Sequence, residues 1–97
     1  MSQIERVDLD QRIREALTIV MDPELGKNVV DLGLIYDVSS DREGNVSISM
    51  TTTTPGCPAA AFLQEAVRTC AAGVDGVRDV AVTLTYDPRW SPDRILN

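Results

Sequence analysis

Two stretches of the chain repeat apolar residues with the period of a helix. In the first, the apolar positions lie three or four residues apart: Leu9, Ile13, Ala16, Leu17 and Val20. Asp8 is its predicted N-cap, with Gln11 three residues later, and Pro23 limits it because the residue before a proline avoids helical backbone. The second predicted helix covers residues 59–72 and is expected to end at Gly73. Its apolar face consists of Leu63, Ala66, Val67 and Cys70, with Phe62 at the edge.

Three other stretches, residues 29–38, 46–50 and 80–86, alternate apolar and polar residues as half-buried strands do. In the first of them, one face is expected to carry Leu32, Leu34, Tyr36 and Val38. The polar turn 39–45 predicts a hairpin between the first two strands. A strand-helix-strand crossover then makes the third strand parallel to the second.

The predicted fold is of the α/β class, an α+β two-layer arrangement with the element order α-β-β-α-β. Both helices are expected on the apolar face of a three-stranded mixed sheet, while the face rich in serine and threonine is solvated. The strand orders 2-1-3 and 1-2-3 both fit this pattern. The 97 residues predict one domain, 1–97, because a chain of this length builds one modest core.

The charge balance narrows the range of partners. The net charge of −6 argues against nucleic acid and against an anionic membrane surface, since both are bound through lysine and arginine. The chain has no apolar run long enough to span a membrane and no signal-peptide pattern at its start, which predicts a cytoplasmic protein. It contains no histidine, so it cannot build Cys-His catalysis, a Ser-His-Asp triad or His-ligated zinc alone.

The predicted topology brings several loops to the sheet edge that carries Cys57. A hairpin places the start of the first strand beside the end of the second, and the parallel third strand ends at the same edge. The loop residues expected there are Asp22, Pro23, Glu24, Asp31, Thr53, Thr54, Asp87 and Trp90. Sites in open α/β sheets form outside the carboxyl ends of strands, so this edge is the predicted site.

The two cysteines are interpreted differently. Cys57 lies in the sequence Pro55-Gly56-Cys57-Pro58 at the start of the second predicted helix, where unpaired N–H groups and the helix dipole favour a thiolate. The two prolines and the glycine fix this loop and expose its tip, which favours a reactive nucleophile or metal ligand over a cap residue. Cys70 falls on the apolar face and is interpreted as a packing residue. It lies about 20 Å from Cys57 along a continuous helix, too far for a disulfide.

The other residues predicted at this sheet edge also have structural interpretations that involve no binding or catalysis. Asp22, Glu24 and Asp87 offer oxygen ligands but are expected more often as solvated or capping groups, and Asp31 as a turn residue. The threonines could donate hydrogen bonds to sulfur or an anion, although strand propensity explains them as well. Trp90, between two prolines, is expected either as a lid over the core edge or as an exposed interaction anchor.

Taken together, the motifs resemble the SufT/PaaD-like family of metal–sulfur cluster assembly proteins, also called the MIP-eighteen domain family. The matching stretches are DPELGKNVVDLGLIYDV (22–38), VSISMTTTTPGCP (46–58), VDGVRDVAVTLTYDPRW (74–90) and SPDRI (91–95). The resemblance implies an iron–sulfur cluster assembly domain with the α-β-β-α-β order. It places the family's reactive cysteine at Cys57, its Asp-Pro-Glu motif at residues 22–24 and its Asp-Leu-Gly motif at residues 31–33. The extra C-terminal cysteines of PaaD-type members are lacking, which disfavours a role in phenylacetate degradation.

The function that this resemblance implies is a non-enzymatic, accessory role in assembling iron–sulfur clusters or transferring them to apo-proteins. Cys57 would hold iron or a cluster transiently, with no tightly bound cofactor. Its partners would be the assembly machinery and apo-client proteins, and a homodimer that shares two Cys57 thiolates is left open. The alternatives are a thiol-dependent enzyme or a redox-active adaptor that uses Cys57 without a stable cluster. A KH-like RNA-binding module fits worse, because RNA binding calls for basic charge.

Overall fold

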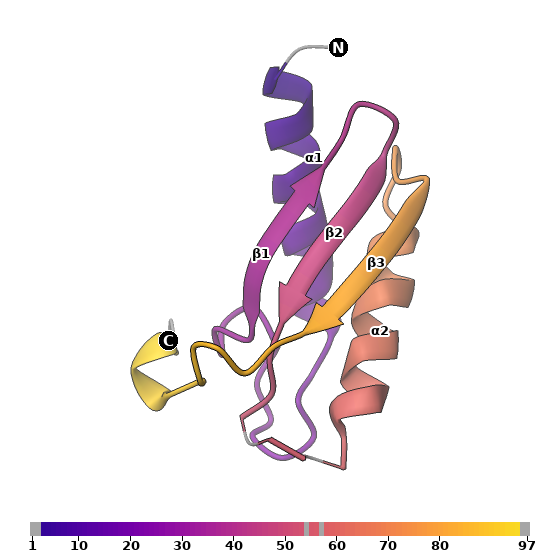
Figure 1. Cartoon of the computed structure of the whole chain (residues 1–97). Helices are drawn as coiled ribbons and strands as arrows, with labels where there is room; N and C mark the ends of the chain where they lie inside the picture. Colours follow the sequence, from indigo (N-terminus) through magenta and orange to yellow (C-terminus); the bar gives the residue numbers. More distant parts are fainter. Residues whose placement is uncertain (1–2, 54, 57, 96–97) are drawn as a thin grey trace.

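The computed structural model describes residues 3–53, 55, 56 and 58–95 (Figure 1). In chain order the elements are α1 (Gln3–Ala16), the short 3-10 helix η1 (Leu17–Ile19), β1 (Ile35–Ser40), β2 (Asn45–Met50), α2 (Ala60–Ala72), β3 (Asp79–Leu84) and the 3-10 helix η2 (Pro92–Arg94). The predicted α-β-β-α-β order is confirmed. The described helices are too short or too polar to serve as bilayer-crossing segments.

The three strands form one mixed sheet in the order β1-β2-β3, which decides between the two orders that the sequence left open. β1 pairs with β2 in an antiparallel hairpin, and β2 pairs with β3 in parallel, as predicted. Figure 1 shows α1 and α2 on the same face of the sheet, with α1 packed over β1 and α2 over β3. The opposite face exposes Ser39, Ser47 and Thr83, so it is the solvated face.

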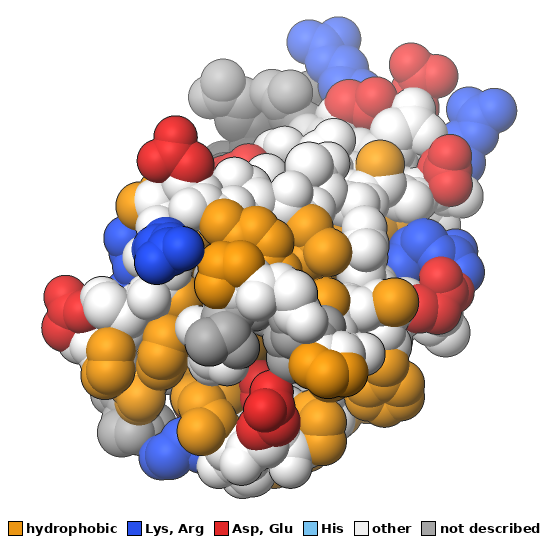
Figure 2. Space-filling model, turned by 60° about the horizontal axis from the view of Figure 1, so that its bottom comes forward, with side chains coloured by type: hydrophobic (Ala, Val, Ile, Leu, Met, Phe, Trp, Pro, Cys, Tyr) orange, Lys and Arg blue, Asp and Glu red, His pale blue; other side chains and the backbone are white. Residues whose placement is uncertain are grey.

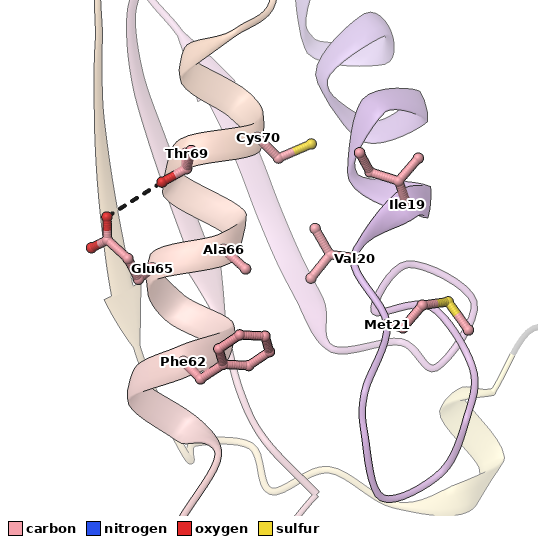
Figure 3. A pocket seen from close by; sticks show the side chains of 8 residues that line it. All are labelled: Ile19, Val20, Met21, Phe62, Glu65, Ala66, Thr69 and Cys70. Carbon is pink, nitrogen blue, oxygen red and sulfur yellow. Dashed lines mark hydrogen bonds between the residues drawn. The ribbon is translucent and has the colours of Figure 1, made fainter.

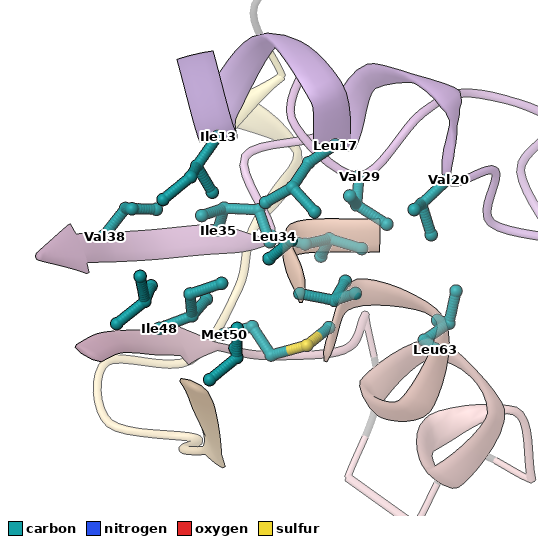
Figure 4. Close-up of a cluster of buried hydrophobic side chains, with 14 of the residues drawn as sticks. Ile13, Leu17, Val20, Val29, Leu34, Ile35, Val38, Ile48, Met50 and Leu63 are labelled. Atoms are coloured by element: carbon teal, nitrogen blue, oxygen red, sulfur yellow. The ribbon is translucent and has the colours of Figure 1, made fainter. Parts of the chain in front are cut away.

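The hydrophobic core lies between the two helices and the sheet (Figure 4). The buried side chains that meet there include Leu9, Ile13, Leu17, Val38, Ile48, Met50, Leu63, Val67 and Ala71. The helical spacing and the strand alternation read from the sequence therefore identify most of the core. Ala66 and Cys70 were expected among them but are only partly buried, because they line a groove between α2 and η1.

Helix α1 begins at Gln3, earlier than the predicted start, so the assignment of Asp8 as the N-cap is wrong. Asp8 lies inside the helix, where its Oδ2 accepts a hydrogen bond from Arg12 Nε at 3.0 Å. This is an ion pair one helical turn apart, which stabilises a helix interior. The residues before Asp8 include no proline or glycine, so nothing in them stops the helix.

The first predicted strand is wrong over residues 29–34, because β1 begins only at Ile35. Residues 28–34 instead form turns that Asn28 organises, with its Oδ1 accepting the N–H groups of Val30 and Asp31 at 3.0 and 2.9 Å. A bulge between Ile35 and Asp37 also breaks the predicted alternation, so Ile35 is buried. Local side-chain hydrogen bonds thus override the strand propensity of this stretch. At the same end of the sheet β3 is also shorter than predicted, since it stops at Leu84 rather than at residue 86.

Candidate functional site

The described residues of three segments, 20–34, 51–59 and 85–95, lie at one end of the sheet, which we call the loop end (Figure 1). The opposite end, which we call the hairpin end, carries the turn between β1 and β2. Figure 2, in which the loop end comes forward, shows several exposed hydrophobic patches on this face. The hairpin and the parallel crossover thus bring these segments together as their topology predicts.

Asp22 organises the loop that follows η1. Its side chain is only 1% exposed, and its Oδ1 accepts hydrogen bonds from the N–H groups of Glu24 at 2.7 Å and Leu25 at 3.1 Å. Such a carboxylate caps a tight turn and satisfies backbone donors that would otherwise be buried without partners. The structure therefore supports the capping interpretation of Asp22, whereas Pro23 and Glu24 are exposed at the surface.

Asp31 belongs to the turn that Asn28 organises. Its carboxylate accepts a hydrogen bond from Asn28 Nδ2 at 3.0 Å, and its own N–H donates to Asn28 Oδ1 at 2.9 Å. This geometry supports the interpretation of Asp31 as a turn residue. Asn28 was not among the residues predicted for the site, although an asparagine three residues before an aspartate is a signal for such a turn.

The segment after β2 is anchored at its base. Thr51 and Thr52 are 0% and 1% exposed, and the Thr51 N–H donates to the Leu34 carbonyl at 2.9 Å. The hydroxyls of Thr52 and Tyr86 share a hydrogen bond of 2.8 Å, which joins the end of β2 to the end of β3. This pair was not predicted, because the alternating pattern indicated that Tyr86 was a strand residue. A tyrosine just past a strand end, beside a row of threonines, is the signal that could have revealed it.

The same segment reaches the surface beyond its anchored base. Thr53 is half-buried, and Pro55, Gly56 and Pro58 are exposed. Two of the predicted site residues, Thr54 and Cys57, lie outside the described residues. The described neighbours of Cys57, Gly56 and Pro58, are therefore surface residues of the loop end.

Helix α2 follows this loop and begins at Ala60, three residues after Cys57 in the sequence. Its N-cap residue, Ala59, makes no side-chain hydrogen bond to the first turn, and that turn contains no acidic residue. The N–H groups of a helix terminus carry the positive end of the helix dipole. With no carboxylate or hydroxyl of its first turn to neutralise it, this terminus favours a nearby anion such as a thiolate.

The C-terminal segment crosses the loop end and packs beside β1. The Tyr36 hydroxyl donates to the Pro88 carbonyl at 2.8 Å, and the Arg94 guanidinium lies 4.9 Å from the centre of the Tyr36 ring. Trp90 packs against the core, and its Nε1 donates to the Leu32 carbonyl at 2.6 Å. Of the two expectations for Trp90, the structure supports the lid over the core edge. The lid lies beside β1, whereas the segment 51–58 leads to α2 (Figure 1).

The acidic residues of the loop end do not gather into a metal site. Within residues 3–53, 55, 56 and 58–95, no group of three carboxylates or thiols is placed to hold a metal ion. Asp22 and Asp31 are engaged in their own turns, and Asp87 is exposed, with its N–H donating to Thr85 Oγ1 at 3.3 Å. The described residues therefore give no support to the oxygen-ligand interpretation of these acids.

Cys70 lies on α2, away from the loop end, and packs partly against the core. Its Sγ donates a hydrogen bond to the Ala16 carbonyl at 3.1 Å. Burial raises the pKa of the Cys70 thiol above its ordinary value. A thiol held protonated in this way is a poor nucleophile, which supports the packing interpretation.

These features define a small α+β fold in which the exposed residues Pro55, Gly56 and Pro58 lie between buried threonines and a helix terminus without a side-chain cap. Residues 10–84 match the protein family described as "Iron-sulfur cluster assembly protein". The chain is 44% identical over 89 residues to an Fe-S protein maturation auxiliary factor of Porphyromonas gingivalis, covering 92% of this chain and 85% of that protein. It is 39% identical over 75 residues to the Fe-S protein maturation auxiliary factor SufT of Staphylococcus aureus, covering 77% and 85%.

The fold is also similar to a solved structure, the crystal structure of a domain of unknown function from Bacillus anthracis. The TM-score is 0.93 at 34% sequence identity, over 97% of this chain and 90% of that one. The chain therefore belongs to the iron–sulfur cluster assembly protein family. The resemblance to SufT-like proteins and the predicted α+β fold are both confirmed.

Proposed function

We propose that this chain is a non-enzymatic accessory factor in the maturation of iron–sulfur proteins and that Cys57 is its reactive thiol. Iron or an iron–sulfur cluster is cargo that the chain holds briefly and passes on. The assembly machinery supplies the cargo, and apo-client proteins receive it. The names of the relatives, maturation auxiliary factors rather than enzymes, support this assignment.

The observation that carries the proposal is the arrangement of the described residues on either side of Cys57 in the sequence. The base is held by the buried Thr52 and its bond to Tyr86, while Pro55, Gly56 and Pro58 are exposed. The uncapped terminus of α2 follows directly in the sequence. An anchored base with an exposed tip suits a thiol that must meet other proteins, because it limits the motion of the tip without covering it.

Residue chemistry favours carriage of a cluster over catalysis by the thiol. The chain has no histidine to act as a base, and a neighbouring carboxylate would raise the pKa of a thiol. A cluster with four thiolate ligands needs more than one cysteine, so the remaining ligands must come from a partner, small thiols or a second copy of the chain. The proposed chemistry requires a reduced thiol, which suits the cytoplasm.

Cluster transfer to an apo-enzyme tests the proposal. The chain is reconstituted under anaerobic conditions with iron, sulfide and dithiothreitol, and its visible absorption and iron content are recorded. It is then mixed with an apo-enzyme that needs a [4Fe–4S] cluster, and the return of enzyme activity is followed. The parent chain is expected to accelerate this return. The Cys57→Ala variant is expected to give only the rate that is measured when the chain is left out of the mixture.

Cys70→Ala is the matched control and is expected to retain transfer, because Cys70 packs in α2. Equal transfer by the parent and by Cys57→Ala would contradict the proposed role of Cys57. Denaturant unfolding of both variants shows that any loss of transfer is not a loss of the fold. The mass of the reconstituted chain in solution shows whether two copies share one cluster.

A further inference from the structure

The two edges of the sheet differ in their regularity. On the β1 side, a bulge between Ile35 and Asp37 interrupts the ladder, and the C-terminal segment packs beside the start of the strand. On the β3 side, residues 79–84 pair with β2 in unbroken register (Figure 1). A bulge twists an edge strand away from other chains, whereas a regular edge strand is a template for another strand. β3 is therefore the edge at which this sheet can be extended.

The backbone groups that β3 presents at this edge follow from its bonds to β2. The N–H groups of Asp79 and Thr85 donate to carbonyls at or next to the two ends of β2, at 3.4 and 2.9 Å. In a parallel ladder, alternate residues direct their N–H and C=O groups to opposite sides of the strand. The odd-numbered residues of β3 therefore bond to β2, and the backbone groups of Val80, Val82 and Leu84 point to the free edge.

The sequence of this edge strand favours pairing with another copy of itself. Residues 80–86, VAVTLTY, contain no charged residue, proline or glycine and are rich in β-branched side chains. Segments of this length and composition are prone to pair with identical segments when they lie at a sheet edge. Val82 and Leu84 are only partly buried against the core, so a further strand would remove more of their apolar area from water.

Two side chains of the described residues bond to this edge from within the chain. Gln64 of α2 donates from Nε2 to the carbonyl of Val82, the central residue of the edge, at 2.9 Å. Asp79 Oδ1 accepts a hydrogen bond from the Val80 N–H at 3.0 Å. An incoming strand needs these same backbone groups, so it would have to displace both side chains.

Helical geometry directs Gln64 to the strand. Figure 3 shows Phe62 and Ala66 on the side of α2 that faces Val20. Gln64 is two residues from each of them, or about 200° around the helix, which places it on the side of β3. Its neighbour Glu65 accepts a hydrogen bond from Thr69 at 3.3 Å along the helix (Figure 3). The Gln64 amide therefore reaches the strand, while the next residue of the helix bonds within α2.

The edge is self-complementary in an antiparallel register. With Val82 opposite Val82 of a second copy, Val80 lies opposite Leu84, so every edge-facing residue meets another edge-facing residue. Their apolar side chains would form one continuous strip on the face that carries the helices. On the other face Ala81 lies opposite Thr83, and neither is charged, so no like charges oppose the pairing there.

We propose that the free edge of β3 is a self-association surface of this chain that Gln64 and Asp79 hold closed. When their bonds are removed, the occupant is β3 of a second copy, in the antiparallel register centred on Val82. The two loop ends then lie at opposite ends of the joined sheet, so this pair differs from a dimer that shares a cluster through Cys57. The proposal does not depend on the chemistry of Cys57.

The mass of variants in solution tests the proposal. Gln64→Ala/Asp79→Ala removes both bonds and is studied by sedimentation equilibrium over a range of concentrations, with a reducing agent and without iron or sulfide. Its mass is expected to rise with concentration from the chain mass of 10.6 kDa toward twice that value. Gln11→Ala/Asp37→Ala is the matched control, because it makes the same changes at exposed residues of α1 and β1. It is expected to keep the mass of the parent chain.

Lysines on the outer face of β3 locate the association. Ala81 and Thr83 are exposed in the single chain and would lie opposite each other in the antiparallel pair. Adding Ala81→Lys/Thr83→Lys to the double variant places like charges directly opposite, which is expected to return the mass to that of one chain. Hydrogen exchange at the amides of Val82 and Leu84, which point to the free edge, is expected to slow with concentration in the double variant only.

Four results would overturn the proposal. The first is a Gln64→Ala/Asp79→Ala variant with the parent's mass at every concentration, because the edge would then be closed without these side chains. The second is association that the two lysines do not reverse, which would place the contact elsewhere. The third is a parent chain whose own mass falls when the lysines are added, because its edge would then be open already. The fourth is growth beyond two copies, since one antiparallel pair uses both β3 edges. Circular dichroism confirms the fold of each variant beforehand.

Discussion

The hairpin end and the loop end of the sheet use similar turns but leave different surfaces. At the hairpin end, Asp41 Oδ1 accepts the N–H of Asn45 at 2.9 Å, and the Gly44 carbonyl accepts the N–H of Arg78 at 2.7 Å. Gly44 is buried with φ at 88°, and a Cβ at this position would collide with the Gly76 carbonyl. At this end of the sheet, direct contacts between backbone segments therefore leave no long loop at the surface.

The loop end also has a glycine that lies close to the backbone of another segment. The segments at this end are longer, however, and reach the surface. Gly33 has φ at 76°, and a Cβ there would collide with the backbone of Arg94 in the C-terminal segment. Buried polar side chains, Asp22 and Thr52 among them, hold the bases of the loops. Beyond these anchors, Pro55, Gly56 and Pro58 remain exposed.

This difference predicts that the hairpin end contributes to stability alone, whereas the loop end contributes to both stability and cluster transfer. Changes at the hairpin end should lower the free energy of unfolding and leave cluster transfer by the folded chain unaltered. Changes to the anchors of the loop end should lower both, because the anchors position the loop that carries Cys57.

Substitution of the two glycines gives the largest expected loss of stability. Gly44→Ala and Gly33→Ala should each lower the free energy of unfolding by about 2–3 kcal/mol, since each adds a Cβ at positive φ against backbone atoms. Gly26→Ala is the matched control, with φ at 68° but nothing within 4 Å of a Cβ, and should lose about 1 kcal/mol. Denaturant unfolding measures all three.

The two glycine variants also differ in where they act. Gly33→Ala should shift the fluorescence of Trp90, the chain's single tryptophan, because the C-terminal segment that carries it must move away from residue 33. Gly44→Ala should leave that fluorescence unchanged in the folded state. The same shift in both variants would mean that the two ends are not independent.

Removal of the Asp22 carboxylate is expected to cause the next largest loss of stability. Asp22→Ala leaves the N–H groups of Glu24 and Leu25 without their acceptor, which should lower the free energy of unfolding by about 1–3 kcal/mol and slow cluster transfer. Asp22→Asn keeps an acceptor oxygen and should restore part of both losses. If Asp22→Ala is destabilised but transfers clusters at the parent rate, the loop that Asp22 organises does not contribute to the function.

Tyr86→Phe should have a smaller effect that is confined to the loop end. It removes the hydroxyl that bonds to Thr52 and should lower the free energy of unfolding by about 1 kcal/mol. Hydrogen exchange should become faster for the amides of residues 51–53 and stay the same for residues 41–46. Uniformly faster exchange at both ends would show only a global loss of stability.

The smallest expected effect is a pH dependence at the hairpin end. Hydrogen bonds from the Asn45 backbone and side chain, with those of Glu43 and Gly44, hold the pKa of Asp41 below its ordinary value. A carboxyl with a lowered pKa in the folded state stabilises the fold above its unfolded pKa of about 3.9, and this contribution is lost as the pH falls through the folded pKa. The stability difference between the parent and Asp41→Asn should therefore shrink below about pH 4. A difference that stays constant down to acid pH would contradict this assignment.

The sequence predicted those parts of the fold that follow from regular apolar patterns. Helical spacing located α2 and most of the core, and strand alternation with a polar turn located β2 and the hairpin. The prediction was wrong over residues 29–34, where strand propensity was overridden by the hydrogen bonds of one asparagine. Side-chain hydrogen bonds of that kind have no period and are hard to infer from composition.

The candidate site was likewise predicted only in part. The capping role of Asp22 and the turn role of Asp31 followed from ordinary turn chemistry. The bond between Thr52 and Tyr86 joins residues that are far apart in the sequence and meet only because β2 and β3 are adjacent. The strand order that makes them neighbours was open until the structure was known. The reactivity of Cys57 stays a prediction.

The rate of alkylation at each cysteine tests the central claim most directly. The folded chain is treated with iodoacetamide over a range of pH, and the modification of Cys57 and Cys70 is followed separately by mass spectrometry. Cys57 should react at least about tenfold faster at neutral pH and reach half its maximal rate below pH 8.5, because a helix terminus favours its thiolate. Cys70 should react slowly, since burial raises the pKa of its thiol. Equal rates, or faster reaction at Cys70, would contradict the assignment of the loop end as the reactive end of the molecule.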